Sequence, residues 1–240
     1  MDNHPTPAAA EALAAAELII FDWDGTLVDS RGVIVETMQA TMLEVGFEPL
    51  PATECQQVIG LGLDEAIRTL VPHADEPERA RMREVYGRRF QQFGATDMPF
   101  FGGVTEGLDR LAAAGRRLAV ATGKSRRGLE RMLGEWGMHG TFQATRCADE
   151  TASKPDPRML RELLAELGVA PERAVFVGDT GFDMEMAHRL GMPRIAVTYG
   201  VHGPERLAPW QPSAWADAFP AVMGHLGCPA LETAPKEGYN

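Results

Sequence analysis

The stretch that decides the fold begins with four apolar residues, Leu18-Ile19-Ile20-Phe21, and continues into Asp22-Trp23-Asp24-Gly25-Thr26-Leu27-Val28-Asp29-Ser30. A short apolar run that stops at a turn signal is typical of a buried β-strand. Residues i and i+2 of a strand point to the same side, so Asp22 and Asp24 are expected to face one crevice at the strand's end. Open α/β sheets bind their ligands at that position.

Two carboxylates placed this close repel each other unless a cation or a shared proton relieves the repulsion. Oxygen-rich sites of this kind suit Mg²⁺, so the motif predicts a magnesium site that includes Asp22 and Asp24. The alternative is structural, because Asp-Gly is also an ordinary turn dipeptide that often ends a buried strand. The rest of the chain has to decide between the two interpretations.

The composition is that of an ordinary globular protein. Of the 240 residues, 45% are hydrophobic and 24% are charged, which fits one large domain or a core with a smaller insertion. The net charge of −11 argues against binding to nucleic acid or to anionic membranes. No run approaches the roughly 18 consecutive apolar residues of a membrane-spanning helix. A small phosphate ester would need a local positive pocket.

The N-terminus and the cysteines bear on location. No Lys or Arg precedes Arg31, so the chain lacks the charged start of a secretory signal, and a cytoplasmic location is expected. Cys55, Cys147 and Cys228 are far apart and form no C-x-x-C pair, which predicts reduced thiols. The six histidines form no H-x-H or H-E-x-x-H pair, which gives little support for a nitrogen-rich metal site.

Two patterns divide the chain. Residues 31–99 show helical periodicity typical of a helical insertion, with helices predicted at 33–45, 64–71 and 77–93, ended by Gly46, Pro72 and Gly94. From Gly102 onward strands alternate with helices, which is typical of an α/β parallel sheet covered on both faces. Strands are predicted at 117–121, 174–177 and 194–197, with a weaker one near 141–145. A helix is predicted at 159–167, with Asp156 as its N-cap, Pro157 in its first turn and Gly168 as its stop.

The later strands also end in polar residues. Strand 117–121 runs into Thr122-Gly123-Lys124-Ser125, where a hydroxyl, a flexible backbone and a helix N-terminus suit an anion. A simple helix cap by Ser125 explains this segment equally well. Lys154 precedes a predicted helix start, where a cation gains nothing from the helix dipole. Either it reaches into the crevice to hold a phosphate oxygen, or it is a solvated loop lysine.

The fourth polar segment is Gly178-Asp179-Thr180-Gly181-Phe182-Asp183, which follows strand 174–177. Asp179 lies at the strand's end and Asp183 lies one helical turn later, a spacing that can aim both carboxylates at one ion. The alternative is that Asp179 or Thr180 caps the helix while Asp183 exploits its N-terminal dipole. For this segment alone the helix cap is the better explanation.

All four segments occur in one order at equivalent positions, and together they resemble the four motifs of the haloacid dehalogenase superfamily of phosphatases. The motifs are Asp22-Trp23-Asp24-Gly25-Thr26, Thr122, Lys154 and the segment 178–183. The resemblance covers residues 18–200, and the phosphoglycolate phosphatase-like branch fits best. It implies a Rossmann-like parallel sheet core at 17–30 and 100–227, with an inserted α-helical cap domain at 31–99. Residues 228–240 are expected to form a flexible tail.

The resemblance also implies roles for the motif residues. Asp22 is the expected nucleophile, forming an aspartyl-phosphate, and Asp24 the expected proton donor and acceptor. The expected magnesium ligands are Asp22, the backbone carbonyl of Asp24, and Asp179, with Asp183 as a further ligand or a neighbour of the ligands. The phosphoryl oxygens are expected to be held by Thr122, Gly123 and Lys154.

The expected function is a Mg²⁺-dependent phosphatase acting on a small phosphorylated metabolite, either phosphoglycolate-like or a sugar phosphate. A β-phosphoglucomutase-like isomerase shares the Asp22 and Asp24 arrangement and stays open, as does a catalytically silent phosphate-binding protein. The cap is expected to select the substrate, and Arg68 is one candidate for contacting a substrate carboxylate. The sequence does not reveal the oligomeric state or the physiological substrate.

Overall fold

The computed structural model describes residues 5–228, which form a six-stranded parallel sheet in the order β3-β2-β1-β4-β5-β6. This is the Rossmann-like order, with the first strand in the centre. The predicted α/β fold class is therefore confirmed. The strands are β1 (Leu18–Phe21), β2 (Arg117–Thr122), β3 (Ala144–Cys147), β4 (Ala174–Gly178), β5 (Arg194–Val197) and β6 (Ala214–Ala216).

Strand β1 is apolar at every position because both of its faces are covered. Ile19 and Phe21 belong to one buried cluster, whereas Leu18 and Ile20 belong to another on the opposite face. The first cluster also takes in residues of α1 (Pro7–Ala14), α6 (Val104–Ala113), α7 (Arg126–Glu135) and α11 (Phe219–His225). The second takes in residues of α8 (Arg158–Leu167), α9 (Gly181–His188) and α10 (Pro204–Leu207). The sheet is thus the middle of three layers.

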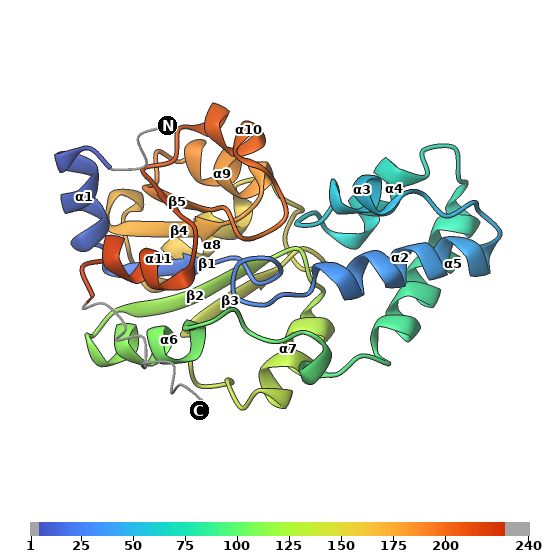
Figure 1. Cartoon of the computed structure of the whole chain (residues 1–240), viewed down its shortest axis with the longest axis horizontal. Coiled ribbons are helices and arrows are strands. Elements are labelled where there is room, and N and C mark those ends of the chain that lie inside the picture. Colours follow the sequence, from blue (N-terminus) through green and yellow to red (C-terminus); the bar gives the residue numbers. More distant parts are fainter. Residues whose placement is uncertain (1–4, 229–240) are drawn as a thin grey trace, which may run out of the picture.

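A helical part is inserted between β1 and β2 and extends to the right of the sheet in Figure 1. We call this part the cap, keeping the predicted bounds 31–99. It has a buried core of its own, built around Met38, Met42, Ile67 and Met82. Its helices are α2 (Arg31–Val45), α3 (Ala52–Gln56), α4 (Leu63–Leu70) and α5 (Glu76–Phe90), followed by the short η1 (Ala95–Asp97). Two further 3-10 turns, η2 (Pro171–Arg173) and η3 (Ala208–Trp210), lie in the rest of the chain.

Several local predictions need correction. The weak strand expected near 141–145 is β3 at Ala144–Cys147, and the edge strand β6 was not predicted. Helix α5 ends at Phe90 rather than near residue 93. Helix α8 begins at Arg158, so Pro157 precedes the helix instead of lying in its first turn. Asp156 still receives a cap-like hydrogen bond, from the Arg158 N–H to Oδ1 at 2.9 Å.

The ends of other helices follow their sequence signals. Gly46 adopts a φ of 101° at the end of α2, a backbone conformation that glycine tolerates and other residues avoid. Within residues 5–228, no helix is both long and apolar enough to cross a membrane. The tail predicted at 228–240 lies outside the described residues except for Cys228.

Candidate active site

The candidate site lies where the central strands end. Phe21 on β1 is in register with Val120 on β2 and with Val177 on β4, so the residues that follow these strands meet at one edge. The Asp22 N–H extends the pairing by donating to the Val177 carbonyl at 2.9 Å. Asp22 therefore lies between the segment that carries Thr122 and the segment that carries Asp179. All three side chains are buried.

Three carboxylates converge at this edge. Oxygens of Asp22, Asp179 and Asp183 all lie within 4.8 Å of one another, and each of the three residues is at most 1% exposed. Three buried carboxylates at this separation destabilise one another strongly unless positive charge is present. The cluster is therefore an oxygen-rich site with the ligand type that divalent cations such as Mg²⁺ prefer.

Lys154 supplies part of the missing positive charge. Its Nζ lies 2.7 Å from Asp22 Oδ1 and 2.7 Å from Asp183 Oδ1, and the residue is 1% exposed. Burial opposes the charge on this ammonium group, but Asp183 and Asp22 outweigh burial and raise its pKa. The solvated-lysine alternative is thus wrong: the side chain from the loop before α8 reaches the carboxylates. One ammonium group still faces three carboxylates.

Asp179 is held from two sides. Thr26 Oγ1 donates to its Oδ1 at 2.9 Å, and the Val201 N–H donates to its Oδ2 at 2.8 Å. Burial nevertheless raises its pKa to about 7, and the nearby Asp183 adds to this rise. The carboxylate is thus positioned before any ligand arrives, and its negative charge is only partly stabilised by the protein.

Asp183 serves two purposes at once. Thr180 and Asp183 form a complete capping box at the start of α9, which confirms the helix-cap interpretation of this segment. In it, Asp183 Oδ2 accepts from the N–H and the hydroxyl of Thr180, at 3.0 Å and 2.7 Å. Its other oxygen accepts from Lys154, so the same side chain also belongs to the carboxylate cluster. The cap and the ligand interpretations are therefore compatible.

Asp22 is the least satisfied member of the cluster. Its contact with Lys154 is an ion pair, and neither of its oxygens accepts a well-aligned hydrogen bond within the described part of the chain. Burial, which outweighs the attraction of Lys154, raises its pKa well above the ordinary value. Buried acceptors without donors are costly, so the open oxygens of Asp22 fit a role in binding a cation or in attacking a substrate.

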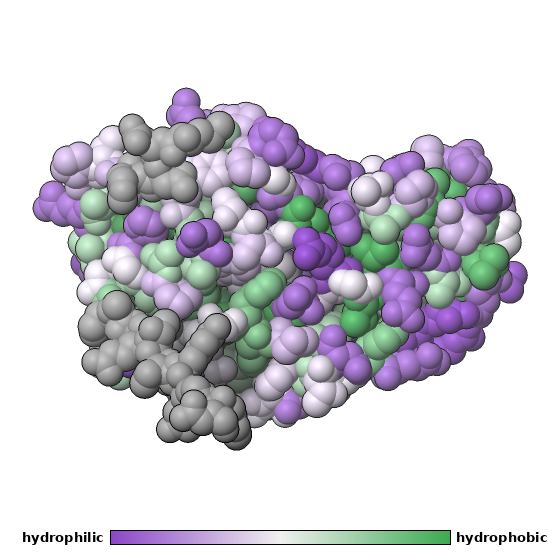
Figure 2. All heavy atoms as spheres, in the orientation of Figure 1, coloured by the Kyte–Doolittle hydropathy of each residue, from purple (hydrophilic) through white to green (hydrophobic). Residues whose placement is uncertain are grey.

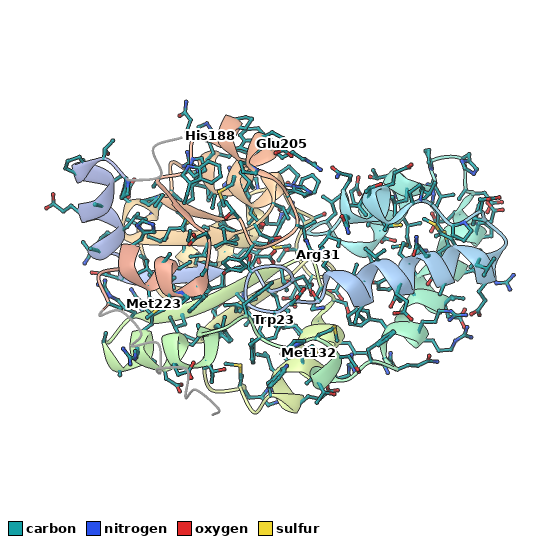
Figure 3. The ribbon with its side chains drawn as sticks, in the orientation of Figure 1. Trp23, Arg31, Met132, His188, Glu205 and Met223 are labelled. Atoms are coloured by element: carbon teal, nitrogen blue, oxygen red, sulfur yellow. The ribbon has the colours of Figure 1, made fainter. Side chains whose placement is uncertain are left out.

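Asp24 lies outside the carboxylate cluster. Its Oδ1 accepts from Ser30 Oγ at 2.5 Å and lies 2.9 Å from Lys124 Nζ. Trp23, which lies between Asp22 and Asp24 in the sequence, is fully buried in the core cluster that includes residues of α7. Figure 3 labels Trp23 and Met132, a member of this cluster on α7. The prediction that Asp22 and Asp24 face one crevice is confirmed, because both residues line the same cavity.

Sequence reasoning missed the partners of Asp24. Lys124 lies in the segment 122–125 after β2, and Ser30 lies four residues after the first motif, but the sequence pattern assigns neither of them a role. The Lys124 Nζ also lies 4.6 Å from the centre of the Phe90 ring at the end of α5. The position of Lys124, two residues after the end of β2, is a sequence signal that could have suggested a role at the site. Its pairing with Asp24 is visible only in the structure.

The segment after β2 combines a helix cap with close packing. Ser125 Oγ accepts from the Gly128 N–H at 3.2 Å and caps α7, which confirms the structural interpretation of this serine. Thr122 is fully buried, and its hydroxyl accepts from the Lys124 N–H at 3.2 Å. A Cβ on Gly123 would lie 2.5 Å from the Leu61 carbonyl oxygen, so only glycine lets the cap loop approach here.

A cavity of about 360 Å³ lies between the cap and the strand ends. Asp22, Asp24, Gly123 and Lys124 line it on the core side, and residues of α2 to α5 line it on the cap side. Arg68, the suggested contact for a substrate carboxylate, does not line it: this side chain is half exposed and lies 3.9 Å from Glu65. That suggestion is wrong for the geometry observed.

Comparison with known proteins identifies the family. The sequence model of the haloacid dehalogenase-like hydrolases matches residues 19–197. The chain belongs to the haloacid dehalogenase-like hydrolases. The probable phosphatase IndB of Dickeya dadantii is 34% identical over 86% of this chain and 92% of its own length. A phosphoglycolate phosphatase of Agrobacterium fabrum is 32% identical over 76% of this chain and 81% of its own length.

A solved structure shows the same fold for this hydrolase. The crystal structure of a predicted phosphoglycolate phosphatase from Haemophilus somnus is 25% identical and has a TM-score of 0.77. The match covers 88% of this chain and 97% of that structure. The four motifs and the inserted helices therefore lie in the fold that their resemblance implied, and the hydrolase is an enzyme.

Proposed function

We propose that this hydrolase is a Mg²⁺-dependent phosphatase that cleaves small phosphomonoesters through an aspartyl-phosphate. The observation that supports the proposal best is the buried group of Asp22, Asp179 and Asp183 around a single lysine. The names of the relatives agree, because they include phosphoglycolate phosphatases and an N-acetylmuramic acid 6-phosphate phosphatase of Pseudomonas aeruginosa. We also propose the cytoplasm as its location, and no role in binding nucleic acid.

In the first step of the proposed reaction, an oxygen of Asp22 attacks the phosphorus in line with the ester bond. The bond between phosphorus and the alcohol oxygen breaks, and Asp24 gives the alcohol its proton. In the second step Asp24 takes a proton from a water molecule, whose oxygen attacks the phosphorus. The bond between phosphorus and the Asp22 oxygen breaks, and inorganic phosphate is released. Asp22 and Asp24 then have the same protonation states as at the start.

The residues around Asp22 fit a divalent cation. Asp22, Asp179 and Asp183 would offer carboxylate oxygens and Asp24 its backbone carbonyl, and the bound ion would stabilise charge on the transferring phosphoryl group. Thr122, the Gly123 backbone and Lys154 would hold the remaining phosphoryl oxygens. The cap would cover the site and keep bulk water away from the aspartyl-phosphate.

The direct test measures phosphate release from a panel of small phosphomonoesters, including phosphoglycolate and sugar phosphates, with Mg²⁺ and with EDTA. We expect release that requires the metal and that falls about 10³-fold or more in Asp22→Asn, because the substitution removes the nucleophile. Glu36→Gln, an exposed change on α2, is the matched control. Sugar phosphate interconversion without net release would instead favour the mutase alternative, and binding without turnover would favour the silent protein.

A further inference from the structure

The cap turns only uncharged residues toward the cavity. Its apolar wall includes Ile34, Met38, Ile59 and Leu63, and its aromatic wall consists of Tyr86 and Phe90. The two rings are stacked, with centroids 5.7 Å apart and planes 16° apart. Figure 2 shows apolar side chains gathered along the junction of core and cap on the face in view. The wall opposite Asp22 and Asp24 is therefore largely apolar.

Within residues 5–228, three cations line the cavity, all of them from the core, and two of the three already form ion pairs. Lys124 is paired with Asp24, and Arg131 donates to the Phe93 carbonyl oxygen at 2.8 Å and to Glu135 at 3.1 Å. Arg127 is exposed to solvent and donates to Gln91 Oε1 at 3.4 Å. A second anionic group on a substrate would thus meet the apolar cap and, apart from Arg127, cations that already contact a carboxylate.

The cavity is also larger than a two-carbon acid needs. Its volume of about 360 Å³ falls within the range of roughly 300–1,000 Å³ that is usual for pockets that enclose drug-sized ligands. A buried carboxylate without a partner is unfavourable, whereas each buried methylene group is favourable. The volume of the cavity and the apolar character of its cap wall thus both favour a leaving group that is uncharged and apolar.

We propose that the preferred substrates are phosphomonoesters of an uncharged alcohol with an apolar body, either aromatic or aliphatic with about six carbons. This inference rests on the phosphatase activity proposed above and specifies its substrate class. The phosphoryl group would lie at Asp22 while the apolar body fills the space against Tyr86 and Phe90. Phosphoglycolate, whose leaving group carries a carboxylate, would be a poor substrate.

The test compares kcat/KM for ethyl, butyl, hexyl and 2-phenylethyl phosphate with that for 2-phosphoglycolate and glycerol 3-phosphate. All of these leaving groups are primary alcohols, so differences in rate report mainly the fit to the cavity. We expect kcat/KM to rise about fourfold for each added methylene group, from the usual free energy of burying one. A flat or falling series, or a preference for phosphoglycolate that Arg127→Gln abolishes, would overturn the inference.

Two variants locate the effect in the cap. Ile34→Gln places a polar group in the cavity wall and is expected to lower kcat/KM for hexyl phosphate about tenfold more than for ethyl phosphate. Leu43→Gln lies on the same helix at a position that is 68% exposed, so it should leave the series unchanged. Leu63→Gln repeats the test on α4 in case the first variant folds poorly. Equal slopes in the wild type and in both wall variants would contradict the proposal.

The reporter 4-nitrophenyl phosphate separates the two proposals, because its leaving group is activated and needs little help from the cavity. Hydrolysis of the reporter that depends on Asp22, together with a flat alkyl series, would overturn the substrate class and leave the phosphatase proposal standing. Failure to release phosphate from the reporter and from every other ester would overturn both.

Discussion

At the scale of single residues, Lys154 is the side chain on which the site's charge balance depends. It contacts Asp22 and Asp183 at 2.7 Å each and is nearly inaccessible to solvent. We expect Lys154→Ala to lower kcat almost as much as Asp22→Asn, because phosphoryl transfer relies on charge stabilisation more than on any other catalytic effect. Phosphate release at saturating substrate measures this. Retention of most of the wild-type rate with any good phosphomonoester would contradict the assigned role.

Removal of Lys154 also has a structural consequence. Loss of one partner from a buried ion pair typically costs about 3–5 kcal/mol, because the remaining charge is left buried. We therefore expect Lys154→Ala to unfold at a clearly lower temperature than the wild type. Arg81→Ala, an exposed change on the cap, is the control for both readouts.

Lys124 is a residue whose importance only the structure shows. Its contact with Asp24 positions the side chain that we propose as the proton donor. We expect Lys124→Met to lower kcat about tenfold with alkyl phosphates and by less with 4-nitrophenyl phosphate, whose leaving group needs no proton. A ratio of the two losses near one would show that Lys124 acts by another route, such as holding the cap through Phe90.

Most of the site residues that the sequence predicted lie at or just after the end of a strand, or in the first turn of a helix. Asp22, Asp179 and Asp183 could be placed because strand ends of a parallel sheet meet at one edge. The hydrogen-bond partners could not be placed, namely Thr26 and Val201 for Asp179 and Ser30 for Asp24, because rotamers and loop paths depend on contacts between distant segments. Backbone pattern thus predicted the acidic cluster, and side-chain packing determined what holds it in place.

At the scale of elements, Gly123 packs tightly against residues 60–62, which belong to the loop between α3 and α4 of the cap. A Cβ on Gly123 would lie 2.5 Å from the Leu61 oxygen and 2.7 Å from the Gly60 oxygen, both of them backbone atoms. We expect Gly123→Ala to displace the loop of residues 60–62, raising KM and lowering kcat/KM about tenfold, since misplacement by about 1 Å costs this much or more. Steady-state kinetics measure the change.

The matched control for this prediction is Gly140→Ala, where the added Cβ meets nothing within 4 Å. Hydrogen exchange provides a second readout, because a displaced loop should exchange faster at the Gly62 N–H. That N–H now donates to Ser153 Oγ at 2.9 Å. Unchanged kinetics and exchange in Gly123→Ala would mean that the loop can move aside without affecting the site.

Elements with strong, long patterns were predictable, and short ones were not. Helix α2 begins within two residues of its predicted start and ends before Gly46 as expected, since glycine is the common helix stop. The edge strand β6 has only three residues, Ala-Trp-Ala, and its identity depends on pairing with β5. Tertiary contacts thus create elements whose local sequence signal is too weak to recognise.

At the scale of the whole molecule, the alternation of strands and helices predicted the layered core, and the family resemblance implied a cap that selects the substrate. Which cap residues line the cavity emerged only from the structure. Arg68 illustrates the difference. Its place in a cap helix was predictable, but which face of that helix meets the core was not, and the apolar face is the one that lines the cavity. Substrate selection therefore depends on a surface that no single segment reveals.

The site's net negative charge predicts how the whole protein responds to Mg²⁺ and pH. Burial raises the native pKa of Asp179 from 3.8 to about 7, so stability present below pH 4 is lost as pH rises through 7 without metal. A fixed Mg²⁺ concentration that is 100-fold the dissociation constant at pH 8 adds about 2.7 kcal/mol at that pH, which raises Tm by roughly 5–10 °C. We expect the gain to be larger at pH 8 than at pH 5 and small in Asp179→Asn. Thermal unfolding with Mg²⁺ and with EDTA measures it, and an equal gain at both pH values, or a full gain in Asp179→Asn, would rule out the carboxylate cluster as the binding site.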